Sequence, residues 1–368
     1  MPFSPVPKES KSQINKAGQI LVQDKLPAEE LEWARDLANK WRACHAYPIN
    51  TFQATLRLKL KGFPQDSIAA QRLKRMPTII DKLKRYPAMK LTTMQDIGGV
   101  RAILGSVTDV SRLANEYRSN KRLAHELVDQ KDYIQNPRSE DGYRGLHLIY
   151  RYKNKQTPNY DGLRLELQIR TKLQHTWATA VETMGTFLGQ ALKSRQGDQE
   201  WLDFFAITSS AFAHKEGCVP IPRFKDLSPE ETFLAVAKAE ARLRALEKMR
   251  GFSVAVNAIV KGKGSQKSWY YHLIILNSLK KTLQIKAYDR DSFNQAVTDY
   301  AKVEAEAAQG EKIEPVLVSA GPIDKLRRAY PNFFLDIDDF TKIVSGIISV
   351  VKQEKSGYTN SNPLPIDQ

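Results

Sequence analysis

The stretch Leu165-Glu166-Leu167-Gln168-Ile169-Arg170 decides the fold class of this chain. Apolar and polar residues alternate along it, which predicts a strand with one buried face. Glu166 and Arg170 therefore share the opposite face. Upstream, Asp141-Gly142-Tyr143-Arg144-Gly145-Leu146-His147 predicts a glycine-hinged loop that presents an aromatic ring and two polar side chains to solvent. A ring that can stack a base, beside a carboxylate that can hold a metal on phosphates, points to nucleotide chemistry.

The elements around this strand predict a domain of mixed composition. Alternation predicts further strands at residues 97–104 and 146–153, and the quoted strand extends over 163–170. Apolar residues at helical spacing predict helices at residues 27–47, 51–61, 77–86, 108–119, 172–185 and 191–215. Helices together with antiparallel strand neighbours indicate an α+β fold, in which a mixed β-sheet is packed by helices.

The chain has 368 residues, which is enough for two domains with separate cores. Pro220 and Pro222 interrupt the pattern and predict a boundary. A second, smaller α+β C-terminal domain is predicted from strands at 253–260, 269–276, 282–287 and 315–319 and helices at 291–308, 322–330 and 337–353. The predicted regions are an N-terminal helical region (1–54, of which 1–25 is loosely ordered), the main domain (55–216), a linker and bridging helix (217–250), the second domain (251–355) and a disordered tail (356–368).

The composition is strongly basic, with 56 Lys and Arg against 41 Asp and Glu and a formal net charge of +15. Such a surplus favours nucleic acid, nucleotides or an acidic membrane surface as partners, and the alternative is that it only keeps the protein soluble. Cys44 and Cys218 lie far apart without a Cys-x-x-Cys, so neither a disulfide framework nor a thiolate zinc site is expected. No signal peptide and no apolar run of about 18 residues occurs, which predicts a soluble, cytoplasmic protein without a membrane partner.

Residues 72–90 form a basic segment, with seven Lys and Arg against one acidic residue, Asp81. Pro77 can begin a helix, which places Thr78 and Lys82 on one face at positions i and i+4. A hydroxyl and an ammonium side by side near a helix N-terminus suit a triphosphate. The alternative is a solvated basic face, the ordinary explanation of a charge run.

Four segments, taken in order, resemble the RelA/SpoT synthetase domain. They are Arg72-x-Lys74-x3-Thr78-x3-Lys82, Asp96-Ile97-Gly98-Gly99-Val100-Arg101, the Asp141–His147 loop and the Glu166–Thr171 strand. Together they cover roughly residues 55–215, and four ordered motifs are a more specific signal than any one alone. The resemblance implies the RelA/SpoT nucleotidyltransferase-like fold and the transfer of pyrophosphate from ATP to a ribose 3′-hydroxyl.

The resemblance also implies an ATP site and a magnesium site. Arg72 and Arg101 resemble the two guanidinium groups that sandwich the adenine, because an arginine plane stacks well on an aromatic ring. Asp96 and Glu166 resemble the carboxylates that hold Mg²⁺ on the ATP phosphates. Glu166 also resembles the residue that activates the attacking hydroxyl, as general base or as metal anchor. The implied ATP-binding residues are Arg72, Lys74, Thr78, Lys82 and Arg101.

The Asp141–His147 loop supplies the implied acceptor site. Tyr143 resembles the ring that stacks the acceptor base, and Gly142 is expected to give the loop its backbone freedom. The implied acceptor-binding residues are Tyr143, His147, Arg138, Gly142 and Arg144. Arg138 stands where the family often has Lys, and Gly145 where it often has Ser, so these departures concern acceptor specificity.

The C-terminal domain resembles the antitoxin-like domain of CapRel-type fused toxin–antitoxin synthetases, from Trp269-Tyr270-Tyr271 to Tyr330-Pro331-Asn332-Phe333. In those proteins a Tyr-x-x-Tyr segment enters the ATP site and blocks it. The resemblance implies that Tyr330 and Phe333 are autoinhibitory in this chain, where Phe333 lacks the second hydroxyl. It also implies that a phage protein binds this domain as a trigger.

These features together predict an autoinhibited ATP pyrophosphokinase that uses Mg²⁺, takes the 3′ end of tRNA as acceptor and acts in anti-phage defence. No histidine is followed by Asp, so the hydrolase signature of the long bifunctional enzymes is absent. Two alternatives stay open. One is an alarmone synthetase that uses GDP or GTP as acceptor, and the other is a catalytically silent RNA-binding module.

Overall fold

The chain folds into two compact units. The first comprises Met1–Asn136 and Arg144–Leu173, and the second comprises Pro137–Tyr143 and Gln174–Gln368. The predicted division into regions ending at residues 54, 216, 250 and 355 stays a prediction. The computed structural model describes residues 3–23, 26–74, 76–119, 123–191, 195–251, 269–277, 282–289, 291–292, 295–296, 298–299, 302–303, 306, 313–319 and 333–359.

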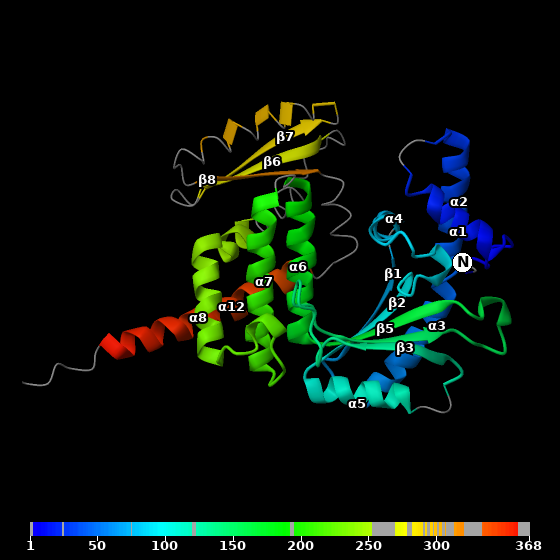
Figure 1. Cartoon of the computed structure of the whole chain (residues 1–368), viewed down its shortest axis with the longest axis horizontal. Helices are drawn as coiled ribbons and strands as arrows, with labels where there is room; N and C mark the ends of the chain where they lie inside the picture. The colour runs from blue at the N-terminus through cyan, green and yellow to red at the C-terminus, as the bar shows by residue number, and fades with distance from the viewer. Residues whose placement is uncertain are drawn as a thin grey trace, which may run out of the picture. The chain divides into compact units, whose positions relative to one another are not determined.

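The first unit is built on a five-stranded sheet with the strand order β1-β2-β5-β4-β3. The strands are β1 (Ile68–Leu73), β2 (Gly98–Leu104), β3 (Glu126–Asp132), β4 (Leu146–Arg151) and β5 (Arg164–Thr171). Strands β2 and β5 run parallel, and the other neighbours are antiparallel. Figure 1 shows helices lying along this sheet. A mixed sheet packed by helices confirms the predicted fold class.

Helices α3 (Ala46–Leu60) and α5 (Val107–Arg118) cover the apolar face of this sheet. The other helices of the unit are α1 (Lys11–Ile20), α2 (Ala28–Ala43) and α4 (Met76–Arg85). Leu165, Leu167 and Ile169 of β5 are no more than 1% exposed, as their alternation predicts. Phe52 of α3 stacks on Tyr117 of α5 with 5.6 Å between ring centroids. The polar face of the same strands is therefore the one left for chemistry.

Three parts of the first unit differ from the prediction. Helix α1 lies in the segment predicted to be loosely ordered. Ser10 caps its N-terminus through a capping box. The Oγ of Ser10 accepts from the Gln13 N–H at 3.3 Å, and the N–H of Ser10 donates to the Gln13 side chain at 2.9 Å. The predicted helix 27–47 is two helices, because the chain turns at Cys44 and His45. The edge strands β1 and β3 were not predicted, since neither alternates clearly between apolar and polar residues.

The second unit combines a helical bundle with a small sheet. Helix α6 (Lys172–Ala191) leads into it, followed by α7 (Arg195–Lys215), α8 (Pro229–Leu243) and α12 (Phe333–Thr359). The sheet has the order β7-β6-β8, from β6 (Trp269–Asn277), β7 (Thr282–Asp289) and β8 (Ile313–Ser319). Phe340 of α12 meets Phe204, Phe205 and Phe212 of α7, with ring centroids 5.8–6.3 Å apart.

The C-terminal predictions are only partly covered by the structure. The predicted strand 253–260, the predicted helix 322–330 and residues 360–368 of the tail lie outside the described residues. The tail prediction is wrong for residues 356–359, which are helical because α12 continues to Thr359. No helix in the described part of the chain is long and apolar enough to cross a membrane.

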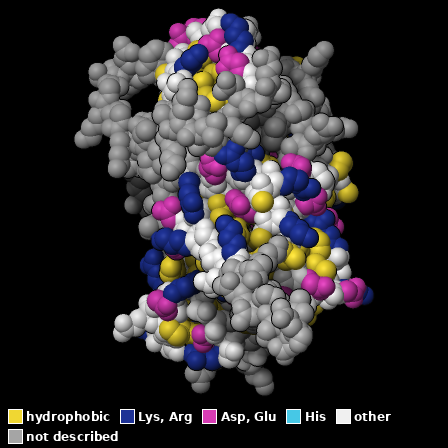
Figure 2. Space-filling model, turned by 90° about the vertical axis from the view of Figure 1, so that its left-hand side faces the viewer, with side chains coloured by type: hydrophobic (Ala, Val, Ile, Leu, Met, Phe, Trp, Pro, Cys, Tyr) yellow, Lys and Arg dark blue, Asp and Glu magenta, His cyan; other side chains and the backbone are white. Residues whose placement is uncertain are grey.

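The net charge is divided unevenly between the two units. The first unit contains 30 Lys and Arg against 16 Asp and Glu, whereas the second contains 26 against 25. Figure 2, which views the side of the molecule that carries α8, shows Lys and Arg side chains interspersed with Asp and Glu. Nearly all of the positive surplus therefore belongs to the unit with the five-stranded sheet.

Candidate active site

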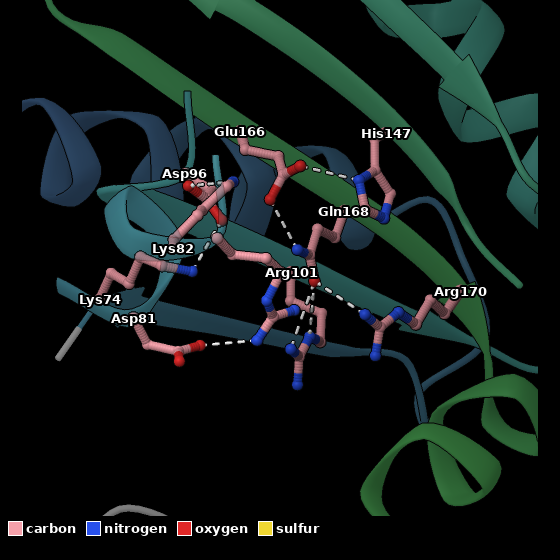
Figure 3. Close-up of polar contacts among 10 residues, drawn as sticks. Lys74, Asp81, Lys82, Asp96, Arg101, His147, Glu166, Gln168 and Arg170 are labelled. Atoms are coloured by element: carbon pink, nitrogen blue, oxygen red, sulfur yellow. Dashed lines mark hydrogen bonds and ion pairs between the residues drawn. The ribbon is translucent and has the colours of Figure 1, made fainter. Parts of the chain in front are cut away.

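The polar face of β5 and its neighbours brings the predicted carboxylate and several cations together (Figure 3). In the strand register, Glu166 lies beside Gly99 of β2, while Gln168 lies between Arg101 of β2 and His147 of β4. Side chains at these paired positions point to the same face because alternation is shared across a sheet. The parallel pairing of β2 with β5 is thus what places Arg101 in the same row as Gln168.

Glu166 is a buried carboxylate, 8% exposed, with a partner on each oxygen. Its Oε1 lies 2.7 Å from Nδ1 of His147, and its Oε2 accepts a hydrogen bond from Nε2 of Gln168 at 2.6 Å. His147 is itself 8% exposed, and its ring meets the edge of Tyr133 with 5.3 Å between centroids. The carboxylate is therefore held in one orientation from both sides.

The environment keeps Glu166 ionised. Burial alone would raise the pKa of this carboxyl, but His147, the hydrogen bond from Gln168 and the charge of Lys82 together lower its pKa to about 2. Glu166 is therefore charged near neutral pH, in a state that can anchor a cation.

Gln168 extends the contacts of Glu166 to two guanidinium groups. Its Oε1 accepts from Nε of Arg101 at 3.4 Å and from the terminal nitrogen of Arg170 at 3.1 Å. One amide thus links the carboxylate to both arginines, since its nitrogen donates and its oxygen accepts. Gln168 and Arg170 are not among the site residues predicted from the sequence, although the alternation of β5 places both on the face of Glu166.

Asp96 forms a second anionic point in the turn before β2. Its Oδ2 lies 2.8 Å from Nζ of Lys74, and its Oδ1 lies 3.0 Å from Nζ of Lys82. Burial would raise the pKa of Asp96, and the nearby Glu166 adds to that, but Lys74 and Lys82 lower the pKa below its usual range. Two predicted ATP-binding lysines therefore pair with the carboxylate of one predicted metal ligand, Asp96.

The two carboxylates fit a magnesium ion that also binds a substrate. Both are ionised, and each is close enough to the other for their charges to interact. In the described part of the chain no three or more His, Cys, Asp or Glu residues form a metal cluster. Mg²⁺ is often held by one or two carboxylates together with phosphate oxygens and water, so this pair suits it only when a nucleotide supplies further oxygens.

The other predicted ATP-binding residues are placed as follows. Thr78 and Lys82 both lie in α4, which confirms the helix and their spacing of one turn. Arg101 is on β2 and contacts Gln168. Arg72 is on β1 opposite Gly99, but its side chain lies outside the described residues. The adenine sandwich between Arg72 and Arg101 therefore stays a prediction.

The predicted acceptor residues belong to both units. Arg138, Gly142 and Tyr143 are in the second unit, whereas Arg144 and His147 are in the first. The guanidinium of Arg138 pairs with Asp141 and lies 5.2 Å from the ring centroid of Tyr143. Cation and ring thus form one small platform.

The loop presents fewer polar side chains to solvent than its sequence predicts. Arg144 is 2% exposed and donates to the carbonyl of Ile134 at 3.3 Å. His147 points into the site, where it lies against Glu166. Gly142 adopts φ +82°, which its expected backbone freedom allows, and its carbonyl accepts from Oγ of Ser209 at 2.5 Å.

The proposed autoinhibitory segment is not placed by the structure. Tyr330 lies outside the described residues, and Phe333 begins α12 with a side chain that is not described. Their contact with an ATP site therefore stays a prediction.

Comparison with known proteins agrees with the site. Residues 71–185 match the family model described as "Region found in RelA / SpoT proteins". This match confirms the predicted RelA/SpoT resemblance for that part of the chain. It includes Lys74, Lys82, Asp96 and Glu166, the residues that the structure brings together.

Two curated relatives from Bacillus subtilis (strain 168) are named GTP pyrophosphokinases. The chain is 32% identical to "GTP pyrophosphokinase YjbM" over 136 residues, which is 34% of this chain and 63% of that protein. It is 34% identical to "GTP pyrophosphokinase YwaC" over 114 residues, 29% of this chain and 52% of that protein. The chain thus spans less than two thirds of either relative.

A solved structure of the small alarmone synthetase 1 from Bacillus subtilis bound to its product pppGpp is also similar. The match covers 46% of this chain and 90% of that chain, at 25% sequence identity and a TM-score of 0.38.

Proposed function

We propose that this protein is an ATP-dependent pyrophosphokinase that transfers pyrophosphate to a 3′-hydroxyl. The observation that carries the proposal is the ionised pair of half-buried Asp96 and buried Glu166, with Lys74 and Lys82 beside it. Anionic residues that can hold a cation, next to ammonium groups that can hold phosphates, are what phosphoryl and pyrophosphoryl transfer requires. The RelA/SpoT match over residues 71–185 supports the same reaction.

The residues of this chain have separable parts in that reaction. Lys74 and Lys82 bind the ATP phosphates, and Thr78 supports them from α4. Asp96 and Glu166 hold Mg²⁺, which when bound neutralises charge on the phosphates. His147 and Gln168 keep Glu166 oriented.

The chemical step conserves atoms and charge as follows. The acceptor 3′-oxygen forms a bond to the β-phosphorus of ATP while the bond between that phosphorus and the α–β bridging oxygen breaks. AMP leaves, and the hydroxyl proton is released. Glu166 is charged beside the lysines, where it can anchor the metal or take that proton as general base.

The acceptor that we propose is the 3′ end of tRNA. The support is the charge of the first unit, 30 Lys and Arg against 16 Asp and Glu, in the same unit as the site. A polyanion is attracted by such a surplus far more than a mononucleotide is. The second candidate is GDP or GTP, favoured by the names of the two Bacillus relatives. A catalytically silent RNA-binding module is disfavoured, since it would need no ionised carboxylate pair.

One experiment separates these functions. The Tyr330→Ala variant of the full chain, in which the proposed block of the ATP site is removed, is incubated with radiolabelled ATP and Mg²⁺, with total tRNA, GDP or GTP as acceptor, and labelled products and AMP are quantified over a range of salt concentrations. Transfer to tRNA whose apparent affinity falls steeply with salt supports the proposal, because each neutralised phosphate releases counterions. Faster transfer to GDP or GTP with little salt dependence would establish the alarmone synthetase. RNA binding without AMP release would establish the silent module.

We also propose that the C-terminal domain inhibits the enzyme in cis and that a phage protein relieves this inhibition in anti-phage defence. The support is the sequence resemblance of residues 251–355 to CapRel-type proteins and the aromatic pair Tyr330 and Phe333.

A further inference from the structure

The short segment Pro137–Tyr143 belongs to the second unit, and its Gly142 is bound to that unit. The Oγ of Ser209, on α7, donates to the Gly142 carbonyl at 2.5 Å. Ser209 is 1% exposed, so this hydrogen bond is shielded from water. A buried hydrogen bond of this kind fixes the position of the peptide group that accepts it.

Gly142 is also packed closely against Ile221 and Ser209. Its φ of +82° is one that other residues rarely adopt. A Cβ added there would lie 2.7 Å from Cδ1 of Ile221 and 2.9 Å from Cβ of Ser209, so no larger residue fits without a shift. Ile221 is fully buried, and its N–H donates to Oγ of Ser210 at 3.1 Å. Adjacent serines of α7 thus hold both the glycine and the isoleucine that packs on it.

Hydrogen bonds within Pro137–Tyr143 connect the other residues of the segment to Gly142. The N–H of Gly142 donates to the carbonyl of Arg138 at 2.9 Å, and the N–H of Tyr143 donates to Oδ1 of Asp141 at 3.0 Å. Nε of Arg138 donates to the same Asp141 oxygen at 3.0 Å, which holds the guanidinium near the Tyr143 ring. Fixing Gly142 therefore also fixes the ring that follows it.

The next residues are bound to the first unit. Arg144 donates to the carbonyl of Ile134, and the carbonyl of Gly145 accepts from the N–H of Tyr133 at 2.9 Å. The change of attachment thus falls between Tyr143 and Arg144. Tyr143 belongs to the segment that Ser209 holds, whereas Arg144 is bound to the unit that contains the five-stranded sheet.

We propose that Ser209 is a positioning residue for acceptor binding, because its hydrogen bond to Gly142 holds the segment that carries Tyr143. This inference rests on the proposed function, in which Tyr143 stacks the acceptor base. Loss of this hydrogen bond should therefore change acceptor binding and leave ATP binding alone.

The test compares Ser209→Ala with Thr208→Val in the full chain. Thr208 is the neighbouring residue on α7 and is fully buried, and its Oγ1 has no hydrogen-bond partner among the described residues, so replacing it with valine should change little. The first measurement is hydrogen–deuterium exchange of the peptide that contains Gly142. The second is the pair of KM values for ATP and for the acceptor that supports transfer.

In Ser209→Ala, exchange at Gly142 should accelerate and the acceptor KM should rise by about three- to tenfold, the range expected for one hydrogen bond, with the ATP KM unchanged. Thr208→Val should match wild type in both measurements. Unchanged exchange in Ser209→Ala would overturn the attachment, and faster exchange with an unchanged acceptor KM would overturn the positioning role. Equal rises in both KM values would also overturn it. If the wild-type chain is silent, both KM values are measured in the Tyr330→Ala background. If that variant also transfers nothing to any acceptor, the proposed function fails and acceptor positioning falls with it, while exchange still decides whether Ser209 holds the segment.

Discussion

Glu166 shows at the scale of one residue how neighbours keep a buried carboxylate charged. From the sequence it could serve as general base or as metal anchor. Despite burial, the contacts with His147 and Gln168 hold its pKa well below the usual range, so it is charged near pH 7. These contacts come from β4 and β5, and only the register of the sheet creates them.

Glu166→Gln should abolish pyrophosphate transfer while the fold is kept. The change removes a charge without changing the size of the side chain, and such losses cost about 10²-fold or more. Turnover at saturating Mg²⁺ and circular dichroism check this. Glu126→Gln is the matched control, since Glu126 is an exposed glutamate of the same sheet paired with Arg151 at 3.0 Å. More than a few per cent of wild-type turnover in Glu166→Gln would refute its assignment.

Tyr143→Ala should weaken acceptor binding far more than ATP binding. Stacking of a base on an aromatic ring contributes about 1–3 kcal/mol, and the ring rather than the hydroxyl provides it. Tyr143→Phe is the control and should remain close to wild type. Calorimetric titration with a non-hydrolysable ATP analogue, together with the acceptor KM, measures the two effects. Equal losses for ATP and acceptor would show that Tyr143 is not an acceptor platform.

At the scale of elements, the junction between α2 and α3 explains why one predicted helix is two. The chain turns at Cys44 and His45, and both side chains are buried. Nδ1 of His45 donates to the Trp41 carbonyl at 2.8 Å, which satisfies a carbonyl at the end of α2. Burial lowers the pKa of His45 to about 4, so the imidazole is neutral near pH 7.

The free energy of unfolding should therefore fall as the pH drops from 6.5 to 4. In this window the unfolded chain protonates His45 while the folded chain does not, and the lost stability amounts to about 3 kcal/mol. Urea unfolding of wild type and His45→Gln across this range measures it. The variant should be less stable than wild type at pH 7, because a buried contact is changed, yet should lose less on acidification. An identical pH slope in both proteins would contradict the buried, neutral histidine.

At the scale of the whole molecule, the two units differ in charge and share the predicted acceptor loop. The positive surplus lies in the unit with Asp96 and Glu166, whereas Tyr143 is held by the other unit.

Tyr330→Ala should turn a tolerated protein into one that stops growth. The ring is proposed to occupy the adenine slot between Arg72 and Arg101, and a tethered blocker acts at roughly millimolar effective concentration. Removing it shifts the population towards the open state. Growth on induced expression is compared for Tyr330→Ala and for the Tyr330→Ala, Glu166→Gln double variant, which should be harmless. A harmless Tyr330→Ala in a protein that is active in vitro would instead favour a partner-binding module.

The sequence by itself determined the mixed sheet, the buried face of β5, helix α4 with Thr78 and Lys82, and the carboxylates Asp96 and Glu166. These follow from periodicity and motif spacing, which act over a few residues. It did not reveal β1 and β3, the break at His45, the Gln168 link or the seat of Gly142 on Ser209. Those depend on strand register and on packing between residues far apart in the chain, such as Gly142 and Ile221, and no local pattern encodes such contacts. The sequence therefore selected the chemistry, and the tertiary structure decided which unit holds each part of it.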